Sequence, residues 1–456
     1  MSSTALASPR ERRTTAFAGR RGPERRPSIT AMAGLAAAPA LLTVAHLLFG
    51  ANQPAAAAWL TAALGLALLI ALATPLRRSL DALGGAAVPA VLFGVVIATA
   101  LWSLTPWGPG GAQPAWSWAG VAPGSLTIDR SATQLEIVKL LGLACAFGLG
   151  ALQGVRRDRA QATVEAIVWI GGAYAAISLI SFLSGAQVAT GDRLTGGFLS
   201  ANSGGTVFGI LTVLGLALFL RAWSRTEGLG ATRRMTASAV SIACLSLTAV
   251  CLILTASRMA LVATLFASGG LLLWTLATRK RDRGAIAVGG GLLIAVAGVL
   301  LAGGNDLLWS RLAATESGMD VRGQLFAVHW SAFTASPVFG WGLGSFDAVN
   351  LQRMTAETAP QLWSMRATHN VYLQWLEEAG LVGAAPMFLL IGWILVGATL
   401  RSGGGRGQTL MIGLICASGV VLIHGLTDFA LQVPSIAAFW SFLLGLQYGF
   451  GRGSGG

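Results

Sequence analysis

The feature that most constrains this chain is a series of long apolar runs. A helix of about 20 apolar residues spans the hydrocarbon core of a bilayer, and runs of roughly that length recur along the whole sequence. The runs are continuous and do not alternate with polar residues, which predicts membrane helices and argues against a membrane β-barrel. The expected fold is therefore all-α, a polytopic membrane protein with about 12 transmembrane helices. The expected spans are residues 30–49, 55–75, 85–104, 134–153, 162–183, 204–220, 237–255, 259–278, 285–303, 381–400, 409–427 and 436–450.

These spans predict five segments along the chain. The longest connection, between the ninth and tenth helices, contains helix-compatible stretches at 320–335 and 368–379, and a structureless loop of that length would be unusual. We therefore expect a helical periplasmic module there. The segments are an Arg-rich tail, expected to be disordered and cytoplasmic (1–29), helices one to nine (30–303), the large periplasmic module (304–380), helices ten to twelve (381–450) and a second cytoplasmic tail (451–456).

The charge of the chain fits a topology signal better than a nucleic-acid partner. Lys and Arg number 31 against 18 Asp and Glu, a formal net charge of +13, and the cations fall in short segments between apolar runs. With the N-terminal tail in the cytoplasm, 23 of these cations lie on the cytoplasmic side and 7 on the other. Cytoplasmic connections are enriched in Lys and Arg. We therefore expect a multi-pass membrane protein with both termini in the cytoplasm and no nucleic acid bound.

Several kinds of chemistry have little support in the residues. No DxD or HExxH pattern appears on the expected outer face, and the first outer loop, residues 50–54, has no acidic side chain. Metal-dependent glycosyl transfer is therefore disfavoured, and neither a metal nor another cofactor is expected. The four cysteines lie in apolar runs without metal-site or disulfide spacing. Ionisable residues inside the spans are sparse, which disfavours coupled transport.

The histidines offer two candidate bases. His369 lies in the outer module, where an imidazole can accept a proton from a hydroxyl near neutral pH, and Thr368 is expected to cap the helix that follows. His424 and Asp428 form a rival, because residues at i and i+4 share one helix face and the carboxylate could orient the imidazole. The other two histidines are expected to be structural: His46 and His329.

Arginines on the expected outer face run against the positive-inside bias, so each needs another explanation. For a single loop arginine this is a contact with water or lipid headgroups. Several arginines converging on one place would instead form an anion site. Arg258 stands out because it lies in a very short turn between two spans, where no long loop accounts for a cation. The outer set is Arg130, Arg193, Arg258, Arg311, Arg322, Arg353 and Arg366.

Several outer stretches carry a family resemblance. They are GDRLTGGFLSAN at 191–202, TASR at 255–258, SPVFGWGLGSF at 336–346, THNVYLQ at 368–374 with EEAG at 377–380, and HGLTDFALQVP at 424–434. In this order, and among these spans, they resemble the O-antigen ligase and O-antigen polymerase (Wzy-like) family of bacterial inner-membrane proteins. The resemblance covers residues 185–450.

The resemblance implies an enzyme, a metal-independent inverting glycosyltransferase at the periplasmic face. Its donor would be an undecaprenyl-diphosphate-linked glycan, and its acceptor a glycan, a lipid core or a protein, with membrane lipid around both. Arg258 and Arg193 match the diphosphate-binding arginines, and His369 matches the histidine that activates the acceptor. Further site candidates are Arg322, Arg366, His424 and Asp428. Polymerisation of O-antigen or exopolysaccharide is favoured over ligation, and a transporter or flippase of lipid-linked saccharides is the alternative.

Overall fold

Helices make up every regular element in the part of the chain that the structure describes. The computed structural model describes residues 29–278, 315–401 and 407–452 and short stretches between 284 and 298, except residues 85, 109, 188–190 and 227. Nearly all of the Arg-rich tail, most of the ninth expected span, residues 304–314 and residues 453–456 therefore lie outside the described residues.

Seven of the described helices are long and apolar enough to cross a membrane. They are α2 (Pro54–Ala73), α5 (Arg130–Gly154), α6 (Arg157–Leu183), α7 (Ala201–Arg225), α8 (Ala231–Leu254), α9 (Arg258–Thr278) and α15 (Val371–Arg401). Shorter apolar helices lie within α1 (Ile29–Leu47), α3 (Ala87–Ser103) and α16 (Gln408–His424), and α17 (Pro434–Arg452) packs in the same bundle. The expected polytopic, all-helical membrane fold is confirmed, while the count of twelve spans and the periplasmic placement of the module stay predictions.

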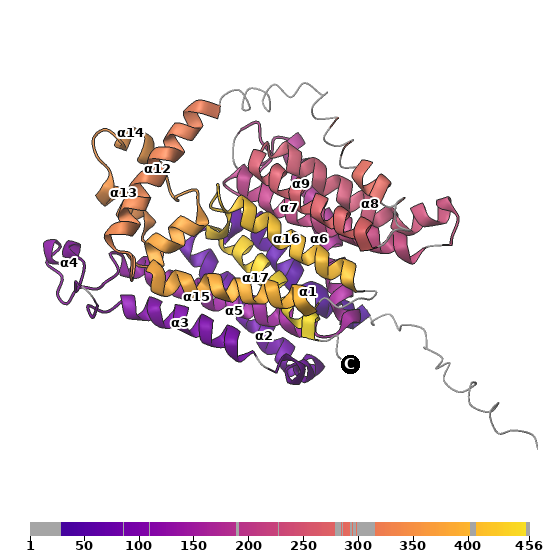
Figure 1. The fold of residues 1–456 in the computed structure, drawn as a ribbon, viewed down its shortest axis with the longest axis horizontal. Coiled ribbons are helices and arrows are strands. Elements are labelled where there is room, and N and C mark those ends of the chain that lie inside the picture. The colour runs from indigo at the N-terminus through magenta and orange to yellow at the C-terminus, as the bar shows by residue number, and fades with distance from the viewer. Residues whose placement is uncertain are drawn as a thin grey trace, which may run out of the picture.

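Helix α7 is the centre of one half of the bundle. Its whole apolar window is buried, and it packs against α8, α16, α9 and α6. On the other side, α2 and α17 pack on α5, and α3 packs on α15 (Figure 1). Helix α12 (Thr315–Ala335) and three short helices gather at one end of the bundle, at the left of Figure 1: α4 (Pro114–Trp118), α13 (Phe346–Arg353) and α14 (Ala359–Leu362). The 3-10 helices are η1 (Phe49–Ala51), η2 (Pro75–Ser79), η3 (Asp81–Leu83) and η5 (Ala430–Gln432).

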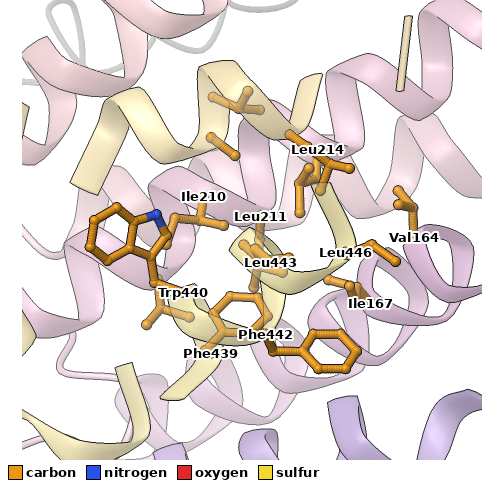
Figure 2. Packing of buried hydrophobic residues seen from close by; sticks show 14 of the residues in the cluster. Val164, Ile167, Ile210, Leu211, Leu214, Phe439, Trp440, Phe442, Leu443 and Leu446 are labelled. Carbon is orange, nitrogen blue, oxygen red and sulfur yellow. The ribbon is translucent and has the colours of Figure 1, made fainter. Parts of the chain in front are cut away.

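Helices α5 and α17 meet along a seam of small residues. A Cβ atom added at Gly150 would overlap the carbonyl oxygen of Phe442, and one added at Gly445 would overlap that of Phe147. In lipid, close backbone packing of this kind is a main source of helix association, because lipid tails are as apolar as the side chains. Beside the seam, large side chains of α17 interdigitate with those of α7 and α6; Figure 2 labels Phe439, Trp440, Phe442, Leu443 and Leu446 on α17.

Helix α15 is interrupted at Gly380, whose φ of 59° lies in the left-handed region that glycine adopts without strain. The break separates a first part that starts at Val371 from a second, apolar part that starts at Leu381, where the sequence predicts a span to begin. A turn formed by residues 336–344, called here the glycine turn, takes over the freed backbone groups. Its hydrogen bonds are Trp341 N to Glu377 O (3.0 Å), Gly342 N to Glu378 O (2.8 Å), Leu381 N to Pro337 O (2.8 Å) and Val382 N to Val338 O (3.1 Å).

Candidate functional site

The loop between α6 and α7 is held firmly against the bundle. Leu194 is fully buried and its N–H donates to the carbonyl of Leu254 at 2.9 Å. The hydroxyl of Tyr174 donates to the carbonyl of Gly196 at 2.6 Å. Gly197, with a φ of 91°, lies so close to the backbone of Leu47 that a Cβ would not fit. Arg193 comes directly before Leu194, so its side chain starts from a backbone that is held in place.

Arg193 contacts the turn that leads to Arg258. The Nε of Arg193 donates to the carbonyl oxygen of Thr255 at 2.7 Å, and its Nη2 donates to Oδ1 of Asn202 at 2.8 Å. Thr255 opens the short connection between α8 and α9, and Arg258 is the first residue of α9. Asn202 is the second residue of α7. Arg193 thus joins the N-terminal end of α7 to the turn that precedes Arg258 and α9, and both arginines and helix N-termini favour an anion.

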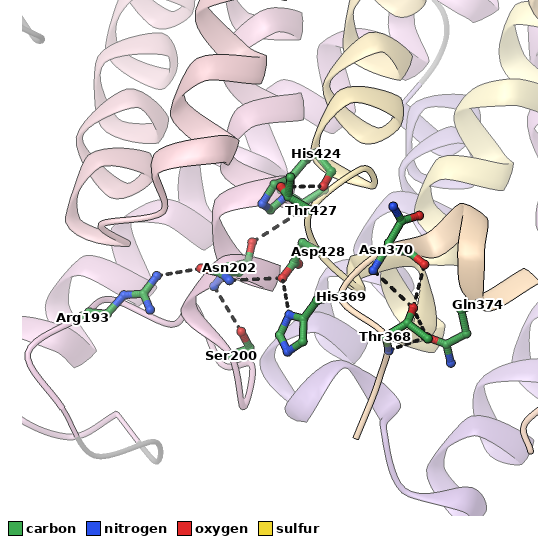
Figure 3. A network of polar contacts seen from close by, with 11 residues as sticks. Arg193, Ser200, Asn202, Thr368, His369, Asn370, Gln374, His424, Thr427 and Asp428 are labelled. Atoms are coloured by element: carbon green, nitrogen blue, oxygen red, sulfur yellow. Dashed lines mark hydrogen bonds and ion pairs between the residues drawn. The ribbon is translucent and has the colours of Figure 1, made fainter. Parts of the chain in front are cut away.

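Asn202 continues the network to a buried carboxylate. Its Nδ2 donates to Oδ1 of Asp428 at 3.1 Å, and Asp428 is fully buried in the turn after α16. The same Oδ1 lies 3.9 Å from Nδ1 of His369, which belongs to the segment before α15 (Figure 3). Arg193, Asn202, Asp428 and His369 therefore form one chain of polar contacts, called here the outer network, drawn from four separate segments.

His369 has an unusual backbone conformation. Its φ is 53°, in a region that costs a residue with a Cβ about 1–3 kcal/mol. Asn370 fixes the start of α15, because its Oδ1 accepts from the N–H groups of Tyr372 and Leu373 at 3.1 and 3.0 Å. The expectation that Thr368 caps this helix is therefore wrong: its hydroxyl donates to the carbonyl of Asn370 at 2.7 Å.

The surroundings of His369 favour its neutral form. Its ring meets the ring of Phe429 edge-on at 4.9 Å, and its side chain is 21% exposed. Burial lowers the pKa of His369, the carboxylate of Asp428 raises it, and the guanidinium of Arg322 lowers it, so the pKa is below its ordinary value. A neutral imidazole is the form that accepts a proton.

The rival pair has a different arrangement from the one its spacing predicts. Helix α16 ends at His424, and Asp428 follows a turn, so the two do not share a helix face. The Nδ1 of His424 shares a hydrogen bond of 2.8 Å with the hydroxyl of Thr206 on α7, and His424 is 1% exposed. The i and i+4 interpretation is wrong because the helix stops too early. Asp428 instead faces His369.

The remaining candidates lie apart from the outer network or at its margin. Arg366 pairs with Asp347 at 3.5 Å on the surface, with the two side chains 70% and 62% exposed. Arg322 on α12 is exposed, and its effect on His369 is electrostatic, since its charge lowers the pKa of that histidine. His46 shares a hydrogen bond of 2.8 Å with Ser435. Within the described ranges, no three His, Cys, Asp or Glu side chains lie together in a way that could hold a metal ion.

A cavity of about 390 Å³ lies between α2, α3, α5, α15 and α17. Its walls are mainly apolar, with Leu64, Phe93 and Met387 among them. The ionisable groups in its lining are the ion pair of Lys139 and Glu136, 2.5 Å apart, and Glu378. Leu431 and Gln432 of η5, shortly after Asp428, also line it. Cavities of this size accommodate small molecules or part of a larger ligand.

A comparison with known protein families matches one stretch of the chain that contains several of these residues. Residues 243–388 match the family model described as O-Antigen ligase. The resemblance to the O-antigen ligase family is confirmed. No curated protein matches the chain. The segment similar to the O-antigen ligase family includes Arg258, Arg322, Arg366 and His369 and ends inside α15.

Sequence reasoning did not single out two features of this site. Asn202 was only the end of a quoted motif, although it joins Arg193 to Asp428. Its position two residues after the Ser200 N-cap, in the first turn of an apolar helix, is a local signal that could have marked it. The other feature is the buried pair of His329 and Glu377, whose Nδ1 and Oε2 are 2.7 Å apart. These residues are far apart in sequence, so no spacing pattern links them.

Proposed function

We propose that this protein transfers a glycan from a polyprenyl diphosphate to an acceptor hydroxyl at the periplasmic face of a bacterial inner membrane, with both termini cytoplasmic. The observation that carries the proposal is the outer network, in which Arg193, Asn202, Asp428 and His369 join an anion-binding end to a base. The match to the O-antigen ligase family supports the same class of reaction.

The arginine end of the network suits a diphosphate. Guanidinium groups bind phosphate oxygens through paired hydrogen bonds, and helix N-termini attract the same anions. Arg193 and Arg258 would hold the diphosphate and stabilise the charge that develops as it leaves. In this arrangement the two guanidinium groups do the work that a divalent cation does in metal-dependent transferases.

The histidine end suits activation of an acceptor. Asp428 would orient Nδ1–H of His369, which leaves Nε2 to take the proton of the acceptor hydroxyl. The acceptor oxygen then attacks the anomeric carbon from the face opposite the diphosphate, a new glycosidic bond forms, and the bond to the diphosphate breaks with its electron pair. The product is inverted at that carbon. The 3.9 Å separation of Nδ1 and Oδ1 would shorten with substrate bound, as catalytic hydrogen bonds commonly do.

The donor's lipid needs an apolar path, and the cavity between α2, α5 and α17 offers one. Its apolar walls would take part of the polyprenyl chain, and η5 connects it to the turn that holds Asp428. Undecaprenyl is the carrier we propose. Membrane lipid would cover the remaining chain length.

Within this class we favour a polymerase that builds O-antigen or exopolysaccharide from lipid-linked repeats over a ligase that passes a finished glycan to a lipid core or a protein. The test is the size distribution of glycans on polyprenyl diphosphate after the protein is removed from its host. Single repeats accumulating on the outer leaflet would establish a polymerase, and long lipid-linked chains would establish a ligase. Units trapped on the cytoplasmic leaflet would overturn the proposal in favour of a flippase.

The same experiment gains a control from reintroduced variants. The Arg156→Ala protein, which loses only an exposed ion pair with Asp158, should restore the wild-type glycan pattern. The His369→Ala protein should accumulate the same lipid-linked species as the deletion. A His369→Ala protein that restores the pattern would contradict the proposed mechanism.

A further inference from the structure

The residue before His369 is held by a buried glutamine. Thr368 is 3% exposed, and its N–H donates to Oε1 of Gln374 at 3.3 Å; its hydroxyl lies 3.5 Å from the same oxygen (Figure 3). This contact reaches backwards from the first turns of α15 to the peptide group between Ala367 and Thr368, one residue before His369. The hydrogen bond between Thr368 and Gln374 lies next to a strained backbone conformation, since His369 has a φ of 53°.

The glutamine is itself held by a carboxylate. Its Nε2 donates to Oε1 of Glu378 at 2.9 Å, and the other oxygen of Glu378 accepts from the N–H of Gly344 in the glycine turn at 2.8 Å. Gln374 and Glu378 are one helical turn apart and each is 4% exposed. A buried relay therefore runs from the glycine turn through Glu378 and Gln374 to Thr368.

The order of groups in the relay is specific. Glu378 accepts at both ends, and Gln374 donates to it while accepting from Thr368, so the donors and acceptors along the relay are matched. An unsatisfied member would be costly at this depth. A second buried glutamine, Gln447 on α17, bonds to Ser418 and Leu414 on α16 and has no contact with this relay.

We propose that Gln374 and Glu378 are positioning residues that hold Thr368 and thereby keep His369 in its left-handed conformation, directed at Asp428. This inference rests on the proposed function, in which His369 is the base. Loss of the relay frees the Thr368 peptide group, the backbone at His369 relaxes toward negative φ, and the imidazole turns away from Asp428. The anion end of the outer network, at Arg193, is not affected.

Three variants separate positioning from simple loss of packing. Gln374→Leu removes both hydrogen bonds of the amide. Glu378→Gln forces two donors to face each other at one end of the relay. The double variant Gln374→Glu with Glu378→Gln restores every hydrogen bond, because the carboxylate at 374 accepts from Thr368 and from the new amide at 378, which accepts from Gly344. Gln447→Leu is the matched control, a buried glutamine with two lost hydrogen bonds elsewhere.

The first readout is steady-state transfer by purified full-length protein in lipid nanodiscs, with the host's undecaprenyl-diphosphate-linked repeat as substrate. We expect kcat to fall about 10- to 100-fold in Gln374→Leu and in Glu378→Gln, with the donor KM unchanged. The double variant should recover most of the lost rate. Gln447→Leu should keep the wild-type kcat per folded molecule. A loss that the double variant does not recover, or an equal loss in Gln447→Leu, would overturn the proposal.

The second readout does not depend on the reaction. The side chain of His369 is 21% exposed, whereas His46, His329 and His424 are at most 2% exposed. Acylation by diethyl pyrocarbonate, read by mass spectrometry, should therefore report mainly on His369. We expect its rate to change several-fold in Gln374→Leu and to return in the double variant. An unchanged rate would overturn the positioning role even if transfer is lost, and a changed rate in a protein without transferase activity would refute only the proposed function.

Discussion

Two histidines of this protein lie beside carboxylates, and the two pairs differ in closeness and in access. In one, Nδ1 of His329 is 2.7 Å from Oε2 of Glu377 and both side chains are completely buried. In the other, Nδ1 of His369 is 3.9 Å from Oδ1 of Asp428, and the histidine is 21% exposed. The first pair is closed and sealed, so it has no route to a reactant. The second is open on the histidine side, so a small molecule can reach His369.

Their neighbours differ as well. The ring of His329 stacks on the ring of Phe346, with 4.6 Å between their centroids. Through its contact with Glu377, His329 also links α12 to α15. Asp428 is joined through Asn202 to Arg193, so the open pair shares a network with cations. A histidine beside a carboxylate is therefore not diagnostic of catalysis; exposure and the next shell of contacts distinguish the two.

The largest effect should follow removal of the open histidine. We expect His369→Ala to lower transfer by about 10²- to 10⁴-fold, the usual contribution of a general base, because no other imidazole is in reach of the acceptor. Release of undecaprenyl diphosphate from the lipid-linked repeat measures it. The matched variant His329→Leu should keep its rate per folded molecule. Equal losses in both variants would erase the distinction between the pairs.

A smaller loss should follow removal of the cation joined to the open pair. We expect Arg193→Ala to reduce kcat/KM by about 10²- to 10³-fold, because a donor that stabilises the leaving group is lost. Arg353 is the matched control, since it lies 4.9 Å over the ring of Trp341 in the region of the sealed pair. Arg353→Ala should leave kcat/KM within about threefold of wild type once the folded fraction is measured.

The carboxylate of the open pair, Asp428, should affect how the rate of transfer depends on pH. In the proposed mechanism transfer needs neutral His369, so we expect the rate to fall as pH drops through the pKa of that group. Asp428 raises this pKa, and Asp428→Asn should therefore lower it and move the acid limb of the pH–rate profile to lower pH, with a maximal rate about tenfold below wild type. Profiles of kcat/KM over the acid and neutral range test this. An unshifted limb would mean that Asp428 does not face the titrating base.

The sealed pair should matter for stability and not for rate. Removing one partner leaves the other buried without its hydrogen bond, which costs about 1–3 kcal/mol. We therefore expect His329→Leu to lower the free energy of unfolding by that amount, seen as a lower Tm in a thiol-reactive dye assay. His369→Leu should shift the Tm far less, because that pair is long and partly exposed. The opposite ranking would contradict the assignment of roles.

The smallest effect should come from the exposed pair near the open histidine. Arg366 is only three residues before His369, yet its contact with Asp347 is on the surface, where such pairs contribute at most about 1 kcal/mol. We expect Arg366→Ala to keep both transfer and Tm near wild type. A loss of more than about tenfold in kcat/KM would place Arg366 in the site after all.

The sequence indicated the helices well, because apolar length is a local property of the chain. The span expected from residue 381 begins where Gly380 breaks α15. It also placed Arg258 in the short turn between two spans, and Arg258 is the first residue of α9. The partner of Asp428 was harder to predict. A four-residue spacing indicates neighbours on one helix face only while the helix continues, and α16 ends at His424. The pairing of Glu377 with His329 depends on how α12 packs against α15, and no local pattern contains that information.

The glycine seam between α5 and α17 has a consequence for how the protein is made. Gly154 leaves the ribosome 280 residues before Pro434, and at about 5–20 residues per second α5 waits roughly 14 to 56 s for the partner that covers its bare backbone. During that interval the seam is open to lipid and to other nascent helices. A bulkier residue at Gly150 or Gly445 should therefore reduce the amount of protein that survives synthesis and membrane insertion, while the molecules that do mature keep an intact outer network.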